Sequence, residues 1–233
     1  MAEQESIQQQ ARADLTVRID DGREDLTLWE HSLRVRTLAE QILMLPEVPA
    51  QRVDRLALEA AACYHDAGWV IQFNEGTISR WEIRSRPTSE SQRGLAADWM
   101  KDRVKGLLTD SSLRLATTAV RQCNRRNTTV IEAQVLAEAE NLDEIGPLAI
   151  WQQLRRSAGE GKGLKAALEA WHRQKEYRFW EARVKESFRF EQTRRLAQQR
   201  LRGMEYCFDS LEEQARGGDM DRLLRTLVGI DRS

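Results

Sequence analysis

The stretch LALEAAACYHDAGW, residues 56–69, decides the fold of this chain. Its residues are apolar on nearly every side of a helix, which predicts a central helix from Val53 to about His65 with other helices packed around it. Gly68 is placed to let that helix end. The helix closes on a histidine followed directly by Asp66, and buried polar side chains of this kind need partners.

Helices are also expected on both sides of this stretch, because there are only four prolines and most segments carry apolar residues at i, i+3 and i+4 spacing. The sequence shows no convincing strand. Thr27 to Glu30 reads as a capping box that starts a helix running to about Leu45. Further helices are expected from a start at Pro87–Gln92, over Leu113–Arg121, over Val130–Leu142, and as one long amphipathic helix over Trp171–Leu211 with Tyr177, Trp180, Val184 and Phe188 on one stripe.

The glycines between Gly159 and Gly163 indicate a flexible connection that divides the chain. We expect a polar N-terminal segment (1–24), a helical domain (25–158) and a C-terminal helical extension (159–233) that packs on the domain. The fold class expected is all-α.

Composition excludes several classes of function. The formal net charge of -1 gives no global attraction to nucleic acid or to an anionic membrane. The N-terminus lacks the pattern of a signal peptide, and no apolar run is long enough to cross a bilayer, so a cytoplasmic protein without a membrane partner is expected. Three scattered cysteines indicate reduced thiols, and the sequence contains no P-loop, no GxGxxG and no CxxC pair.

Two of the three histidines lie on helices that should pack together. His31 shares a helix face with Val35 and Leu38, so it is expected to point inward. His65 ends the apolar central helix and is expected to point inward as well, with Asp66 beside it. Imidazoles and a carboxylate suit one divalent cation such as Mn, Fe, Co, Ni, Zn or Mg, and the lack of thiolate pairs argues against a structural zinc site. From spacing alone, hydrogen-bonded core histidines are the commoner arrangement.

Three blocks favour the metal interpretation: EHSLRV (30–35), CYHDAGW (63–69) and LAEAENLDEIG (136–146). In order and spacing they resemble the blocks of the HD-domain superfamily of metal-dependent phosphohydrolases, over roughly residues 26–155. FRFEQTRRLAQQRL (188–201) resembles the tail of small bacterial HD hydrolases related to nucleotide pyrophosphohydrolases. The resemblance implies an HD-domain-like helical bundle with a C-terminal helical extension.

The resemblance also implies the metal ligands. His31, His65 and Asp66 match the family residue by residue. The family's last block commonly reads Asp-Ala-Asp-x-Leu-Asp with the second Asp as ligand, and Glu140 stands at that position here, with Asp143 at the trailing acid. Either Glu140 binds the metal, or Asp143 binds the metal in place of Glu140, or the metal is held weakly.

The remaining functional groups are less directly implied. Residues 121–124 lack the histidine that related hydrolases often carry there, which disfavours a two-metal site. Asp66 or Glu75 is the expected general base. Arg34, Arg84 and Arg86 are the expected contacts to a phosphorylated substrate.

The leading hypothesis is therefore a metal-dependent phosphohydrolase that acts on a small phosphorylated compound, most plausibly a nucleotide, by attack of metal-activated water. The alternative is a non-catalytic binding or regulatory module with a degenerate metal site. Binding of nucleic acid through residues 173–202, with ten Lys+Arg against four Glu, is disfavoured because the aromatic residues there fall on the packing stripe. The C-terminal helices could also form a homodimer.

Overall fold

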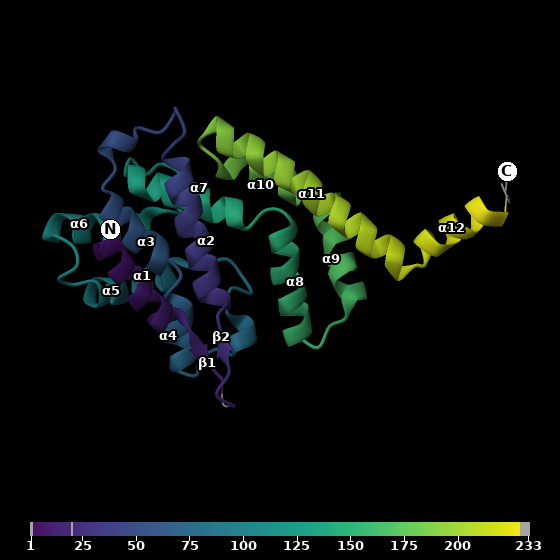
Figure 1. Cartoon of the computed structure of the whole chain (residues 1–233), viewed down its shortest axis with the longest axis horizontal. Coiled ribbons are helices and arrows are strands. Elements are labelled where there is room, and N and C mark those ends of the chain that lie inside the picture. The colour runs from purple at the N-terminus through teal and green to yellow at the C-terminus, as the bar shows by residue number, and fades with distance from the viewer. Residues whose placement is uncertain (1, 20, 229–233) are drawn as a thin grey trace.

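The computed structural model describes residues 2–19 and 21–228, and nearly all of its regular structure is helical (Figure 1). This confirms the all-α class. One two-residue antiparallel hairpin, β1 (Val17–Arg18) with β2 (Glu24–Asp25), was not expected. The helices are α1 (Ala2–Leu15), α2 (Thr27–Ile42), α3 (Arg55–Tyr64), α4 (Gly68–Asn74), α5 (Glu90–Arg103), α6 (Asp110–Gln122), α7 (Ile131–Asp143), α8 (Pro147–Gly159), α9 (Leu164–Glu176), α10 (Phe179–Ser187), α11 (Glu191–Ala215) and α12 (Gly218–Val228), with short 3-10 turns at Ala50–Arg52 and Arg80–Glu82.

Helix α3 is the centre of the N-terminal bundle, as its all-round apolar sequence predicts. Every residue from Ala57 to Tyr64 is buried. Helices α1, α2, α5, α6 and α7 all pack against it. The C-terminal end of α3 therefore places His65 and Asp66 inside the bundle rather than at its surface.

The start of α2 differs from the prediction. Thr27 is the first helical residue, the cap position is Leu26, and no side chain caps the helix there. Instead, Asp25 Oδ1 accepts a hydrogen bond from the Thr27 backbone N–H at 3.0 Å. The expected Thr27–Glu30 capping box is thus wrong, because the carboxylate two residues upstream already satisfies that donor.

Gly68 also has a different role from the one expected. It begins α4 rather than ending α3, and a β-carbon at this position would lie 2.3 Å from the Gln92 carbonyl oxygen. The glycine therefore permits close contact between α4 and the start of α5. That start is as predicted: Ser89 and Gln92 form a capping box.

The single long C-terminal helix expected over Trp171–Leu211 is wrong. Arg178 adopts a left-handed backbone conformation (φ 51°) between α9 and α10, and an extended segment around Phe188 separates α10 from α11. Tyr177 is 77% exposed, so it does not share the buried stripe that contains Trp180 and Val184. The breaks allow each short helix to turn its own apolar face toward its neighbours.

Buried polar contacts attach α11 to the bundle. Glu138 on α7 is fully buried and accepts hydrogen bonds from the Arg189 backbone N–H, at 2.6 Å, and from the Thr193 hydroxyl. Glu47 accepts from the first backbone N–H groups of α11. Helix α12 then projects away from the body of the molecule (Figure 1). Among the described residues, no helix is long and apolar enough to span a membrane.

Candidate metal centre

His31 and His65 face each other in the interior of the bundle. Both are fully buried, and their Nε2 atoms lie 3.0 Å apart. His31 lies one turn into α2 and His65 is the residue after α3, so the contact between these two helices creates the pair.

Each imidazole has a second partner on its other nitrogen. His31 Nδ1 lies 2.7 Å from Asp143 Oδ2, and His65 Nδ1 lies 2.9 Å from the Ala62 carbonyl oxygen. Both partners are acceptors, so each Nδ1 carries the hydrogen and donates it. Without a proton on either Nε2, the two lone pairs point into the same space, and a divalent cation beside both atoms would make this arrangement favourable.

Asp66 adds an oxygen to this space. Its Oδ2 lies 3.4 Å from His31 Nε2 and 3.8 Å from His65 Nε2. Its Oδ1 accepts a 2.7 Å hydrogen bond from the Thr88 hydroxyl, which in turn accepts from Trp69 Nε1 at 2.9 Å. One carboxylate oxygen is thus fixed by the protein while the other faces the imidazoles.

These three residues fit a divalent cation. One ligand atom from each lies within 4.8 Å of the others, and together they form the only such group among residues 2–19 and 21–228. Two neutral nitrogens and one carboxylate oxygen are donors that first-row divalent metals accept. The expectation that His31, His65 and Asp66 could hold one metal ion therefore agrees with their geometry.

The charges around the group keep its carboxylate ionised. Burial alone would raise the pKa of Asp66, but His65, His31 and Arg84 hold that pKa well below its usual range. Burial and Arg84 lower the pKa of His31, yet its hydrogen bonds to Asp143 and Asp66 outweigh them and raise it. Burial lowers the pKa of His65, which nearby carboxylates offset only in part.

The two acids expected to supply a fourth ligand lie outside the three-residue group. Asp143 sits behind His31 and pairs with Arg34, whose Nε is 2.6 Å from Asp143 Oδ1. Glu140 is buried and accepts a 2.7 Å hydrogen bond from Arg93 Nη2. Asp143 thus orients His31 in the way that carboxylates orient metal-binding histidines elsewhere.

Arg93 is a buried residue that the sequence analysis did not single out. Its Nη1 donates to Cys123 Sγ at 2.9 Å while Nη2 bonds Glu140. Burial lowers the pKa of Arg93, but the Glu140 carboxylate outweighs burial and raises it. No signal in the sequence distinguishes Arg93 from the many solvated arginines.

Arg84, which the sequence predicts as a substrate contact, lies against the cluster. Its side chain is 6% exposed, and Nε lies 3.3 Å from Asp66 Oδ2. Its backbone is left-handed (φ 57°), and its Nη1 is buried without a hydrogen-bond partner among the described residues. A strained backbone and an unsatisfied donor in one residue are typical of functional sites.

A pocket of ≈ 220 Å³ is lined in part by Arg84 and Asp143, which contact Asp66 and His31 respectively. Its lining also includes Arg86, whose guanidinium lies 5.8 Å from the centre of the Trp69 ring. The lining includes four arginines and two aromatic side chains beside three glutamines and two acids, and the arginines and aromatic rings suit an anionic ligand with a planar group. Other lining residues that the sequence did not identify are Glu144, Arg156, Phe179, Trp180 and Arg183.

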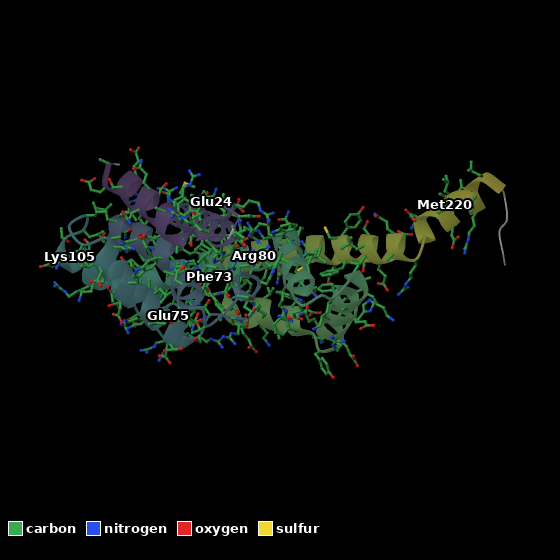
Figure 2. All side chains as sticks on the ribbon, turned by 90° about the horizontal axis from the view of Figure 1, so that it is seen from below. Glu24, Phe73, Glu75, Arg80, Lys105 and Met220 are labelled. Carbon is green, nitrogen blue, oxygen red and sulfur yellow. The ribbon has the colours of Figure 1, made fainter. Side chains whose placement is uncertain are left out.

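Glu75 is placed elsewhere. It is exposed just beyond the end of α4, and Figure 2 shows it at the surface of the molecule. It does not line the pocket beside the cluster.

Comparison with known proteins gives a fold. No protein-family model and no curated protein sequence matches the chain. Solved structures do: Bacillus subtilis YpgQ is 19% identical with a TM-score of 0.59, and the match covers 91% of this chain and 95% of that one. A YpgQ complex with ADP gives the same TM-score at 20% identity. A structure described as a predicted HD superfamily hydrolase, from an uncultured Thermotogales bacterium, has a TM-score of 0.51 at 16% identity and covers 93% of this chain and 92% of that one. This chain therefore has the HD-domain fold.

Proposed function

We propose that this protein is a metal-dependent phosphohydrolase that acts on a small phosphorylated compound, with a nucleotide as the favoured substrate. The observation that carries the proposal is the buried pair of Nε2 atoms, 3.0 Å apart, with Asp66 Oδ2 beside them. Such a mixed nitrogen and oxygen site with three protein ligands leaves positions open for substrate, which is typical of catalytic metal centres.

In this proposal His31, His65 and Asp66 hold the cation. When bound there, a divalent cation lowers the pKa of water and offsets charge on a phosphoryl oxygen. Asp143 keeps the His31 hydrogen on Nδ1, so that Nε2 stays available as a ligand. Arg34 holds Asp143 in place through two hydrogen bonds, which makes Arg34 a positioning residue rather than a phosphate contact.

Arg84 is the proposed phosphate contact. It lines the pocket, lies against Asp66, and retains one buried donor without an acceptor. A phosphate oxygen would satisfy that donor and remove the cost of leaving it unpaired. Arg86 lines the same pocket and adds positive charge for the rest of the substrate.

Asp66 is the proposed acceptor of the proton from the attacking water. Of the two carboxylates considered, it alone lies in the cluster, and its lowered pKa keeps it ionised. Glu75 is exposed and outside the pocket.

A nucleotide substrate is supported by two observations. The pocket lining includes the rings of Phe179 and Trp180 together with several arginines, and these groups suit a base and a phosphate chain respectively. One structure of YpgQ, which has the same fold, is a complex with ADP.

One observation favours the alternative of a non-catalytic binding module. Glu140, at the position where the HD family carries a ligand, is paired with buried Arg93. A cation held by three protein ligands alone could be bound too weakly for turnover.

The test measures the metal content of the purified protein and the release of phosphate or pyrophosphate from a panel of nucleotides with added Mn²⁺. The double variant His65→Ala, Asp66→Ala should lose both metal and turnover. Asp66→Asn should lose turnover while retaining metal, and Glu75→Gln should keep both. An exposed carboxylate, Asp98→Asn, serves as the control. Turnover that persists in the double variant would show that catalysis does not depend on this group, and a wild-type protein without metal or turnover would move the assignment to the binding module.

Asp143→Asn separates positioning from direct ligation. If Asp143 acts through His31, metal affinity should fall about tenfold to a hundredfold without being abolished. Titration with Mn²⁺ or Co²⁺ measures this loss, and an affinity equal to wild type would contradict the positioning role.

A further inference from the structure

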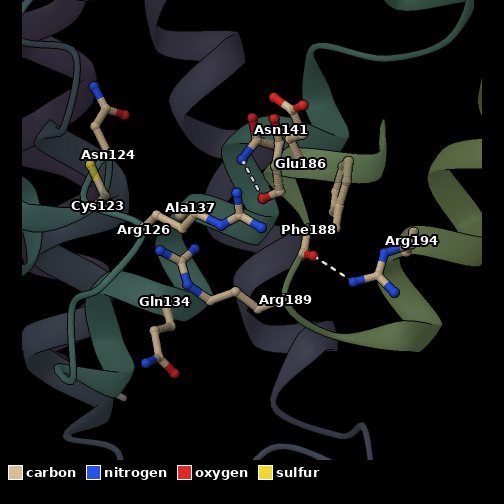
Figure 3. A pocket seen from close by; sticks show the side chains of 11 residues that line it. Cys123, Asn124, Arg126, Gln134, Ala137, Asn141, Glu186, Phe188, Arg189 and Arg194 are labelled. Atoms are coloured by element: carbon tan, nitrogen blue, oxygen red, sulfur yellow. Dashed lines mark hydrogen bonds between the residues drawn. The ribbon is translucent and has the colours of Figure 1, made fainter. Parts of the chain in front are cut away.

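A second and larger pocket has its own lining, which meets the lining of the metal-site pocket where Arg183 donates to Asn141 Oδ1 at 3.4 Å. Its volume is ≈ 500 Å³, and the two linings have no residue in common. It forms where the α6–α7 connection, one face of α7 and the α10–α11 connection meet (Figure 3). Segments from both parts of the chain therefore build it.

The lining is strongly cationic. Arg126, Arg189 and Arg194 contribute three positive charges, and Glu186 is the one acid among the lining residues. Figure 3 shows Arg126 and Arg189 extending across the pocket from opposite sides, one from the α6–α7 connection and the other from the α10–α11 connection. Two cations directed into one space repel each other unless an anion lies between or beside them.

The protein leaves these charges incompletely paired. Among the described residues, Arg126 has no hydrogen-bond or ion-pair partner. The Arg189 guanidinium donates to the neutral Arg125 carbonyl oxygen, at 2.8 Å, and its Nε is buried without a partner among the described residues. Arg194 pairs with Glu191 and donates to the Phe188 carbonyl oxygen at 2.8 Å, but its Nε too is buried and unsatisfied.

Uncharged polar groups complete the lining. Asn124 and Asn141 border the pocket, and Asn141 donates a 3.3 Å hydrogen bond to the Ser187 carbonyl oxygen. Amides beside unpaired guanidinium groups are suited to anionic oxygens and to the hydroxyl or ring groups attached to them. The volume falls within the range of sites for small organic ligands and exceeds what one phosphate needs.

We propose that this pocket binds a phosphate-bearing small molecule at a site separate from the metal centre. Arg126 and Arg189 contact the phosphate, and the amides contact the remainder of the molecule. A small molecule is favoured over nucleic acid because the unpaired arginines converge on one pocket between two chain segments rather than forming a stripe along a surface.

Calorimetric titration of inorganic pyrophosphate into the metal-depleted full-length protein tests the proposal. Arg126→Ala should weaken binding about tenfold or more, as expected for loss of a charge-assisted hydrogen bond. The matched control is Arg125→Ala, which removes an adjacent arginine that pairs with Glu90 and does not line the pocket. Because Arg126 is exposed and unpartnered, its loss should leave the thermal midpoint unchanged.

The proposal is overturned if the wild-type protein does not bind pyrophosphate, if Arg126→Ala and Arg125→Ala have equal affinities, or if single-stranded RNA displaces pyrophosphate and its binding depends on Arg126. Nucleotide turnover with Mn²⁺ is measured on the same variants. Turnover that is retained in Arg126→Ala while pyrophosphate affinity falls supports a separate site. Loss of turnover together with affinity would make the pocket part of the catalytic centre and contradict the separation.

Discussion

Cys123 shows how a single buried side chain makes stability depend on pH. Its thiol contacts Arg93 and is 2% exposed. Burial raises the pKa of Cys123 to about 12, which Arg93 offsets only in part. The folded protein therefore keeps a proton that the unfolded chain, with a thiol pKa near 9.0, releases.

The free energy of unfolding should consequently fall above pH 9, by at most about 1.4 kcal/mol per pH unit from this group. Cys123→Ala should reduce the slope, whereas Cys207→Ala, at a half-buried position, should not. Urea unfolding at pH 8, 9 and 10 measures the slopes. Identical slopes in wild type and Cys123→Ala would contradict this assignment.

The metal-site residues illustrate what sequence can and cannot reveal at this scale. His31, His65 and Asp66 were identified because two short blocks carry them, and the fold brings them within 4.8 Å. The roles of Asp143 and Arg93 depend on contacts between residues far apart in the chain, since Asp143 follows His31 by 112 positions. No local pattern encodes such a pair.

At the scale of elements, helix α4 approaches α5 closely because residue 68 is glycine. A β-carbon there would lie 2.3 Å from a backbone oxygen, which cannot move without shifting the helix. Gly68→Ala should therefore destabilise the protein by about 1–3 kcal/mol, as overpacking does in other cores. The affinity for a metal ion should fall as well, because Asp66 lies two residues away.

Gly94, within α5, provides the matched control. A β-carbon there meets only a flexible arginine terminus at 3.8 Å. Gly94→Ala should stabilise the protein by up to about 1 kcal/mol through higher helix propensity. Thermal unfolding compares the two variants, and equal midpoints would show that α4 can move away from α5.

Helix ends were predictable where side chains decide them. The helix start expected at Pro87–Gln92 is present, and Ser89 and Gln92 form a capping box there. The same pattern at Thr27 fails, because Asp25 bonds the donor first. The break at Arg178 has no sequence signal, since a left-handed arginine is stabilised by the packing on either side rather than by its own propensity.

At the scale of the whole molecule, the C-terminal extension has two unlike parts. The first part of α11 packs on the bundle through α7 and α8. Helix α12 carries Met220, Leu223, Leu224 and Leu227, which are 49–71% exposed, and Figure 2 shows Met220 on the projecting arm. Exposed apolar side chains gathered on one helix are a common feature of interaction surfaces.

The predicted homodimer can therefore be tested on this arm. Ending the chain at residue 216 removes side chains that are exposed in the described part of α12, so the thermal midpoint should change by no more than about 2 °C. If two copies join through α12, light scattering should give twice the 26.9 kDa chain mass for the full-length protein and a single-chain mass for the truncated one.

A Leu223→Ser, Leu227→Ser variant should reproduce the truncation because it removes apolar surface while keeping the helix. A full-length protein that is monomeric at all concentrations would contradict the homodimer, and a truncated protein that stays dimeric would place the interface elsewhere.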